Sequence, residues 1–311
     1  MRWDEHDVPR QDGRTFVVTG ASAGLGLENA RALAAAGATV VMATRDEAKT
    51  VAAAERIRRA VPSARLDHVP LDLAELASVR AAATMVRDRY PVLDVVIANA
   101  GLMATPLRRT VDGFELQLAV NHLGHAALIA QLLPSMEAAV DPRVVVVSSE
   151  MHRIGRIDLD DPHFERRRYQ RWLAYGQTKL ANLLYVRELQ RRLDATDRDV
   201  VVAAAHPGYA RTELQTKGPA LQGGLSGLVN RTFSATANTL FAQPARTGAL
   251  PQLYAATAPD VPRGSYWGPS SGVRGAPAPA SPSRAAQDGE VAGALFELTE
   301  RLTGVLHPAS R

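Results

Sequence analysis

The sequence has 311 residues, of which 46% are hydrophobic and 22% charged, with a formal net charge of +4 and no cysteine. This length and composition predict a single globular domain over residues 1–311 and exclude a disordered or fibrous chain. The missing cysteines exclude disulfides, thiolate catalysis and cysteine metal sites. The charged first residues and the lack of a long apolar run predict a cytoplasmic protein with no transmembrane segment.

The positive charge comes mostly from arginines that are scattered along Ala-rich segments and accompanied by Asp and Glu. That pattern is typical of a solvated surface. Only residues 165–172 concentrate basic and aromatic side chains, and no recognised nucleic-acid-binding motif accompanies them. We therefore expect no nucleic-acid partner.

Strands and helices alternate through the first two thirds of the chain. Short β-branched apolar runs predict six strands, at residues 14–20, 38–45, 64–73, 92–101, 142–150 and 199–208. Helical spacing predicts helices at 25–37, 46–61, 75–90, 113–136, 175–193 and 291–304. Continuous apolar strands in this order favour an α/β fold, a doubly wound (Rossmann-type) parallel sheet flanked by helices.

The alternation ends after about residue 207. Gly- and Pro-rich stretches in this part predict mobile loops on the substrate side and a flexible surface segment at 268–288. Ligands of doubly wound folds bind at the carboxyl ends of the strands. The residues that follow each strand are therefore the candidate site.

The first strand runs into a turn that contains Gly20, Gly24 and Gly26. Glycines let the backbone turn tightly and approach a pyrophosphate, while the following helix N-terminus supplies amide donors and a favourable dipole. The spacing G-x-x-x-G-x-G differs from the common G-x-G-x-x-G fingerprint. Taken alone, such a turn is equally compatible with a structural role.

Tyr175 and Lys179 lie one turn apart on a predicted helix, so their side chains share a face. Taken alone, this spacing more often means a tyrosine packed along a solvated lysine. The motifs elsewhere in the chain decide between that interpretation and a proton-transfer pair.

Several motifs stand in the order, and at the strand ends, that are typical of the short-chain dehydrogenase/reductase family. They are the glycine turn, Asn-Ala-Gly at 99–101, Val-Asn-His-Leu-Gly-His at 120–125, Val-Val-Val-Val-Ser-Ser at 144–149, Tyr-x-x-x-Lys at 175–179 and the segment 206–212. The sequence resembles this family over nearly its whole length. Residues 112–125, 177–182 and 264–269 resemble its retinol dehydrogenase and WW-domain oxidoreductase branch. Ala98 departs from the family pattern, which has a second asparagine there, and should weaken a structural hydrogen bond near the cofactor.

The resemblance implies an oxidoreductase that transfers hydride between NADP(H) and an alcohol or carbonyl group. Tyr175 would be the general acid/base, and Lys179 would lower its pKa from about 10 and reach the nicotinamide ribose. Ser149 would hydrogen-bond the reacting oxygen. Ser148 is the alternative, but strand alternation points the two hydroxyls in opposite directions, and the family pattern favours Ser149. Asn121 would hold a water that links Lys179 to solvent; its structural alternative is a buried residue at a helix bend.

The resemblance also implies a set of cofactor contacts and a substrate lid at 213–243. Thr212 would bond the nicotinamide carboxamide or cap a helix, and Asp72 would cap a turn or contact adenine. Leu, Val and Phe in the lid favour a lipophilic small-molecule substrate. The full set of implied cofactor residues is Gly20, Ser22, Gly24, Leu25, Gly26, Thr44, Arg45, Asp72, Leu73, Asn99, Ala100, Gly101, Tyr175, Lys179, Pro207, Gly208 and Thr212.

His122, His125 and His206 could suggest a metal site. Their spacing fits no common zinc pattern, and no carboxylate completes the set. We interpret the three histidines as structural and expect no metal.

The end of the second strand predicts the cofactor preference. An acid there would bind the ribose hydroxyls of NAD and repel the 2′-phosphate of NADP, but Thr44 occupies this position. Arg45 follows, with a guanidinium suited to phosphate, and Ser22 adds a hydroxyl donor. Ala23, where many NADP-specific relatives carry a basic residue, and Asp46, which could pair with Arg45, limit the preference. We expect NADPH to be favoured over NADH by about one to two orders of magnitude.

Two other functional classes share part of this pattern. A catalytically idle dinucleotide-binding sensor or scaffold has the fold and the glycine turn but usually lacks the complete Asn, Ser, Tyr and Lys set, which is intact here. A nucleotide-sugar epimerase or dehydratase shares Tyr-x-x-x-Lys but normally has a larger C-terminal part. The residues leave open the substrate, the direction of reaction and whether the chain forms a homo-oligomer.

Overall fold

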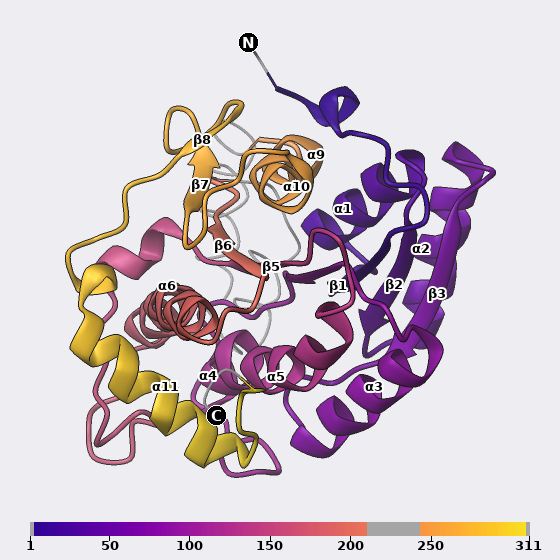
Figure 1. The fold of residues 1–311 in the computed structure, drawn as a ribbon. Helices are drawn as coiled ribbons and strands as arrows, with labels where there is room; N and C mark the ends of the chain where they lie inside the picture. The colour runs from indigo at the N-terminus through magenta and orange to yellow at the C-terminus, as the bar shows by residue number, and fades with distance from the viewer. Residues whose placement is uncertain (1–2, 210–242, 309–311) are drawn as a thin grey trace, which may run out of the picture.

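The computed structural model describes residues 3–209 and 243–308. Its eight-stranded sheet has the order β3-β2-β1-β4-β5-β6-β7-β8 (Figure 1). The neighbouring strands are parallel except β7 and β8, which are antiparallel. The strands are β1 (Thr15–Thr19), β2 (Thr39–Thr44), β3 (Arg65–Pro70), β4 (Val95–Ala98), β5 (Arg143–Val147), β6 (Val201–Ala205), β7 (Tyr266–Pro269) and β8 (Pro277–Pro279). The first six strands have the order of a dinucleotide-binding fold, so the predicted fold class is confirmed.

Helices cover both faces of the sheet (Figure 1). The α-helices are α1 (Gly24–Ala35), α2 (Glu47–Ala60), α3 (Leu76–Arg89), α4 (Leu116–Leu118), α5 (Gly124–Met136), α6 (Arg171–Ala195), α9 (Ala245–Gly248), α10 (Leu250–Thr257) and α11 (Gly289–Thr303). The shorter turns are η1 (Glu5–Asp7), the π-helical η2 (Ala119–Leu123), η3 (Glu150–Ile154) and η4 (Ala285–Gln287).

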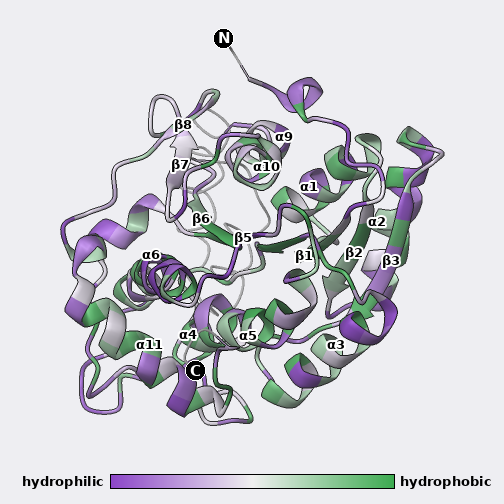
Figure 2. Cartoon of the chain, in the orientation of Figure 1, coloured by the Kyte–Doolittle hydropathy of each residue, from purple (hydrophilic) through white to green (hydrophobic). Residues whose placement is uncertain are grey.

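The sheet separates two hydrophobic cores. Phe16 and Val18 of β1 pack with α1, α2 and α10, whereas Val17 packs with α3, α5, α6 and α11 on the other face. This division follows from the alternation of side chains along a strand, and it explains why residues 16–18 in the middle of β1 are all apolar. Figure 2 shows the contrast with the edge strand β3, which carries hydrophilic residues.

The structure differs from the sequence prediction in three places. The single helix expected at 113–136 is divided into α4, η2 and α5, with a π-helical turn between the two α-helices. Helix α6 begins earlier than predicted, because the side chain of Gln170 caps it by accepting a hydrogen bond from the backbone N of Leu173 at 2.7 Å. Strands β7 and β8 were not predicted, and they place regular structure in the segment 268–288.

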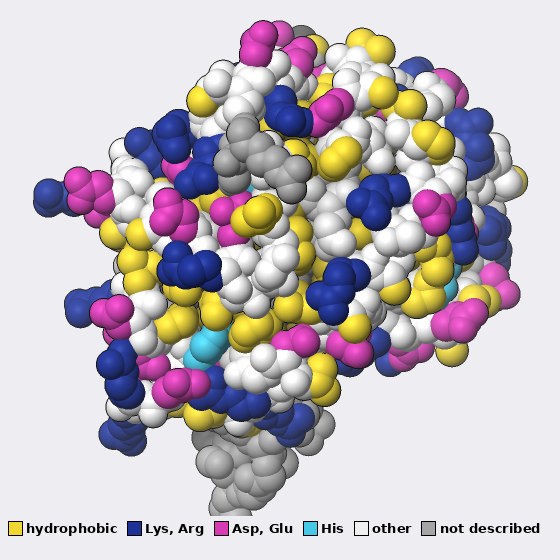
Figure 3. All heavy atoms as spheres, turned by 60° about the horizontal axis from the view of Figure 1, so that its bottom comes forward, with side chains coloured by type: hydrophobic (Ala, Val, Ile, Leu, Met, Phe, Trp, Pro, Cys, Tyr) yellow, Lys and Arg dark blue, Asp and Glu magenta, His cyan; other side chains and the backbone are white. Residues whose placement is uncertain are grey.

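Two general features of the described chain bear on its partners. None of its helices combines the length and the hydropathy needed to cross a bilayer. Figure 3 shows one face of the molecule, on which Lys and Arg side chains alternate with Asp and Glu instead of gathering in one basic patch.

Candidate active site

The glycine turn brings the start of α1 against the end of β4. Gly20 and Gly24 have φ values of +70° and +56°, a region that favours glycine. A Cβ on Gly26 would lie 2.5 Å from the carbonyl oxygen of Gly20 and 2.6 Å from Nδ2 of Asn99. Ala23, the N-cap of α1, offers no side-chain hydrogen bond to the helix. Among the described residues, no side chain caps the first amides of α1, which fits a bound pyrophosphate.

Thr19, which sequence reasoning did not single out, organises the exit of β4. Its hydroxyl oxygen accepts hydrogen bonds from the backbone N of Asn99 and of Ala100, both at 2.9 Å, and lies 2.9 Å from Nε2 of His125. Asn99 donates from Nδ2 to the carbonyl oxygen of Thr19, but its Oδ1 is buried with no hydrogen-bond partner among residues 3–209 and 243–308. A buried acceptor without a donor is uncommon, and here it lies beside the glycine turn, where a dinucleotide could supply the donor.

At the end of β2 the hydroxyl of Thr44 is engaged inside the protein. It hydrogen-bonds with the hydroxyl of Thr50 on α2 and lies 3.2 Å from Nε2 of His68 on β3. Position 44 at the carboxyl end of β2 is therefore not an acid, and the hydroxyl of Thr44 already has partners inside the protein. Arg45, the next residue, has a side chain that is 76% exposed.

The expected pairing of Arg45 with Asp46 is wrong. Asp46 caps α2, accepting a hydrogen bond from the backbone N of Lys49 at 3.0 Å, and its carboxylate lies 2.5 Å from Nζ of Lys49. Arg45 instead reaches the loop after the neighbouring strand β3, with Nη1 3.4 Å from Oδ2 of Asp72. Asp72 also caps a turn through the backbone N of Ala74. Because exposed ion pairs contribute little, a phosphate could compete for the Arg45 guanidinium.

The two serines after β5 have different roles. Ser148 is 1% exposed, and its hydroxyl donates to the carbonyl oxygen of Lys179 at 2.8 Å. Ser149 caps η3, with its hydroxyl accepting from the backbone N of Met151 at 3.2 Å, and it lies close enough to Tyr175 to lower the pKa of the phenol. Of the two serines, Ser149 is therefore the one placed to contact an oxygen that reacts at Tyr175.

Tyr175 and Lys179 are both buried, at 8% and 4% exposure, with Nζ of Lys179 5.7 Å from the centre of the Tyr175 ring. Burial lowers the pKa of Lys179 to about 8. Burial also raises the pKa of Tyr175 to about 12, although the nearby Ser149 side chain acts in the opposite direction. The shift is opposite to the one expected from a neighbouring ammonium, because burial is the largest effect on Tyr175. Nζ of Lys179 donates to the carbonyl oxygen of Val147 at 2.9 Å.

Asn121 lies in the π-helical turn η2 and is fully buried. Its Nδ2 donates to the carbonyl oxygen of Leu102 and to Oγ1 of Thr178, and its Oδ1 accepts from the backbone N of Leu102 at 2.7 Å. A Cβ on Gly101 would lie 3.1 Å from Oδ1 of Asn121 and 3.8 Å from Nζ of Lys179. Asn121 thus anchors the loop after β4, with Oδ1 on the side that faces Gly101 and Lys179.

The remaining predicted residues lie around this centre. Gly208, after β6, has a φ of +63°, and the carbonyl oxygen of Pro207 accepts from Nε2 of Gln243 at 2.6 Å. Leu25 and Leu73 are buried, and Ser22 is half-buried in the glycine turn. Thr212 and residues 213–242 of the expected lid lie outside the described residues.

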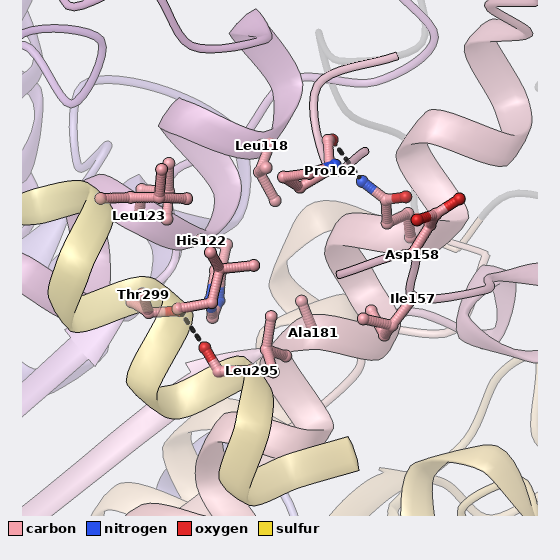
Figure 4. A pocket seen from close by; sticks show the side chains of 12 residues that line it. Leu118, His122, Leu123, Ile157, Asp158, Pro162, Ala181, Leu295 and Thr299 are labelled. Atoms are coloured by element: carbon pink, nitrogen blue, oxygen red, sulfur yellow. Dashed lines mark hydrogen bonds between the residues drawn. The ribbon is translucent and has the colours of Figure 1, made fainter. Parts of the chain in front are cut away.

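The three histidines are each held by the protein. Nδ1 of His122 lies 3.2 Å from Oδ1 of Asn182, and Nε2 lies 2.9 Å from Oγ1 of Thr299 at a small pocket between η2, α6 and α11 (Figure 4). Burial lowers the pKa of His122 to about 4 and that of His125 to about 3. Within residues 3–209 and 243–308, no three His, Asp or Glu side chains are grouped so that they could hold a metal.

Comparison with known proteins places the chain in a family. The family model described as short chain dehydrogenase matches residues 14–220. Retinol dehydrogenase 13 of Homo sapiens is 38% identical over 306 residues, which cover 96% of this chain and 87% of that protein. Polyprenol dehydrogenase of Mus musculus is 38% identical over 305 residues, covering 96% and 86%.

A solved structure agrees with these matches. The crystal structure of an uncharacterized protein from Mycobacterium Paratuberculosis is 43% identical, with a TM-score of 0.82 and coverage of 99% of this chain and 100% of that one. The resemblance inferred from the motifs is therefore confirmed. The chain belongs to the short-chain dehydrogenase/reductase family of nicotinamide-dinucleotide-binding oxidoreductases, and within it the chain is retinol dehydrogenase-like.

Proposed function

We propose that the protein transfers hydride between NADP(H) and the alcohol or carbonyl group of a lipophilic small molecule. The observation that carries the proposal is the buried Tyr175–Lys179 pair, with Ser149 close enough to lower the pKa of the phenol, beside a glycine turn whose helix N-cap, Ala23, makes no side-chain hydrogen bond. An idle sensor or scaffold has no need to keep a lysine and a tyrosine buried together with shifted pKa values.

The residues of this chain divide the chemistry between them. A bound nicotinamide would supply the hydride to the carbonyl carbon, or accept it from the alcohol carbon. In reduction, Tyr175 gives its phenolic proton to the carbonyl oxygen while the Ser149 hydroxyl hydrogen-bonds that oxygen. A pKa of about 12 keeps the proton on Tyr175 until the oxygen becomes basic. Lys179, with a pKa of about 8, can exchange a proton near neutral pH.

Cofactor and substrate preference rest on two further observations. Arg45 is exposed at the end of β2, where no acid repels a 2′-phosphate, and its partner Asp72 is partly exposed as well. Two relatives are named for retinol and polyprenol, both long apolar alcohols. Together with the apolar residues in the segment 213–243, these names support a lipophilic substrate.

The direct test is oxidation of NADPH and of NADH by the purified protein across a panel of carbonyl compounds. We expect turnover with NADPH, and a higher kcat/KM for aromatic, terpenoid or long-chain aldehydes and ketones than for triose-sized polar carbonyls. Higher kcat/KM for the trioses would contradict the lipophilic substrate. NADPH binding without turnover of any compound, in either direction, would favour the idle sensor.

A further inference from the structure

A polar cluster away from the reacting atoms joins the two loops that precede α4 and α6. Its centre is the hydroxyl of Tyr169, to which Nε2 of Gln117 donates at 2.7 Å. The same hydroxyl faces two acceptors, the carbonyl oxygen of Thr105 at 3.0 Å and Oε1 of Glu115 at 3.1 Å. The cluster therefore ties the loop after β4 to the loop before α6.

Glu115 is an unusual member of this cluster, because its carboxylate is fully buried. Burial raises its pKa. The side chain caps α4 by accepting hydrogen bonds from the backbone N of Gln117 at 3.0 Å and of Leu118 at 2.7 Å. Burying a carboxylate costs several kcal/mol unless hydrogen bonds compensate it. Three other residues, Thr105, Gln117 and Leu118, make hydrogen bonds with Glu115 or with its partner Tyr169.

The cluster reaches both elements that carry the reaction. Helix α4, capped by Glu115, continues directly into η2 with Asn121. Gln117 donates from Nε2 to the carbonyl oxygen of Arg171 at 3.1 Å, in the first turn of α6 and one turn before Tyr175. Its Oε1 accepts from the backbone N of Ala104, which has a φ of +51°. The loop after β4, the turn of Asn121 and the start of α6 therefore share one set of hydrogen bonds.

We propose that Glu115, Gln117 and Tyr169 are positioning residues that hold the turn of Asn121 and the helix of Tyr175 in register for the reaction. The inference rests on the proposed function, in which Tyr175 transfers the proton. The three residues act through the backbone and through Asn121, and none of them is assigned a contact with the reacting oxygen. Their loss should change the rate of the chemical step more than the affinity for the cofactor, because the glycine turn lies elsewhere.

The first test compares two tyrosines of the same region. Tyr169→Phe removes the central hydroxyl, and Tyr185→Phe is a matched control on α6, because its buried hydroxyl binds Nε2 of His307 at 2.7 Å and its ring stacks on Phe296 of α11. We expect Tyr169→Phe to lower kcat by about tenfold or more, since small misplacements of reacting groups are costly. The NADPH Kd of both variants, and the kcat of Tyr185→Phe, should stay within about twofold of wild type.

A purely structural role predicts a different pattern. Both variants lose one buried hydrogen bond, so both should lower Tm, and Tm alone does not separate the roles. The pH profile of kcat should shift only in Tyr169→Phe, because only that variant disturbs the surroundings of Tyr175. A kcat and a pH profile equal to those of Tyr185→Phe would overturn the proposal.

Hydrogen exchange provides a readout that needs no turnover. The backbone N–H of Leu102 is held by Asn121, and that of Ala104 by Gln117. Both amides should exchange faster in Tyr169→Phe and at the wild-type rate in Tyr185→Phe. Unchanged exchange of both amides in Tyr169→Phe would contradict the proposed coupling, whether or not the wild type turns over a carbonyl compound. A wild type that turned over no carbonyl compound would count against the proposed function instead.

Discussion

The two sides of the candidate site differ in composition: one consists mostly of backbone and the other of buried side chains. Around β1, β2 and β4 the site is mostly backbone, with Gly20 and Gly26 and the uncapped start of α1. Around β5 and α6 it consists of buried side chains whose pKa values burial has moved, Tyr175 upward and Lys179 downward. Backbone amides can hold a cofactor without taking part in the reaction, whereas shifted side chains can exchange protons. Changes on the first side should therefore alter cofactor affinity, and changes on the second should alter the rate.

Lys179→Ala should have the largest effect, because Lys179 belongs to both sides. Its Nζ lies near Gly101, in the loop after β4 on the side of the site where we expect the cofactor. The same Nζ donates to the carbonyl oxygen of Val147 at the end of β5. We expect kcat to fall by about a thousandfold, the range of general acid–base contributions, and NADPH affinity to fall as well. Steady-state kinetics and a fluorescence titration with NADPH measure the two effects separately. An unchanged Kd would assign Lys179 to the reaction alone.

Gly26→Ala tests the backbone side. The added methyl group would meet the carbonyl oxygen of Gly20 at 2.5 Å, so the start of α1 must move away from Asn99. We expect a loss of about 1–3 kcal/mol in the free energy of unfolding and an NADPH Kd raised by about tenfold or more. Gly289→Ala is the control, because a Cβ at the start of α11 would meet only the side chain of Arg187 at 4.0 Å. If Gly26→Ala bound NADPH with the affinity of the wild type, the pyrophosphate would not bind at the glycine turn.

Arg45→Ala sharpens the comparison, because Arg45 is the side chain on the cofactor side that we expect to discriminate between cofactors. The ratio of kcat/KM for NADPH to that for NADH should fall by about 10- to 100-fold, or about 1.4 to 2.8 kcal/mol. The kcat at saturating NADPH should not change. Arg56→Ala serves as the control, since Arg56 is an exposed arginine of α2 whose partner is Glu28. The same ratio in Arg45→Ala and wild type would exclude Arg45 as the source of preference.

Acid should destabilise the protein through its buried histidines, and we expect this effect to be smaller than those of the substitutions above. Burial holds the folded-state pKa of His122 at about 4 and of His125 at about 3, below the ordinary 6.5. Below pH 6.5 the unfolded chain then binds more protons than the folded chain. The contribution of the two neutral histidines to the free energy of unfolding is therefore complete above that pH and is lost as pH falls toward 4. Thermal melts from pH 7 to 4 measure this loss, and His122→Gln should flatten the slope. An identical slope in the variant would contradict a neutral buried His122.

The glycine turn and the start of α1 were predictable because their signals are local. An apolar strand followed by Gly20, Gly24 and Gly26 specifies a turn and a helix start within a few residues. The partner of Asp46 was not predictable, because the choice between Arg45 and Lys49 depends on where α2 begins and on the proximity of Asp72.

Elements that depend on distant contacts were also missed. The turn of Asn121 has ordinary helical spacing in sequence, and it becomes π-helical where its side chain holds Leu102 and Thr178. Strands β7 and β8 are short and contain Pro269, Pro277 and Pro279, residues that normally argue against a strand. They lie at the far edge of the sheet, where β8 pairs with β7 and with no other strand of the described residues.

The most direct test of the division between binding and chemistry is Tyr175→Phe, measured for both turnover and NADPH binding. The ring of Tyr175 is packed in the core, and phenylalanine keeps that packing while removing the hydroxyl that transfers the proton. The account predicts a kcat lowered by about a thousandfold and an NADPH Kd within about twofold of wild type. A kcat near that of the wild type would contradict the central role of Tyr175.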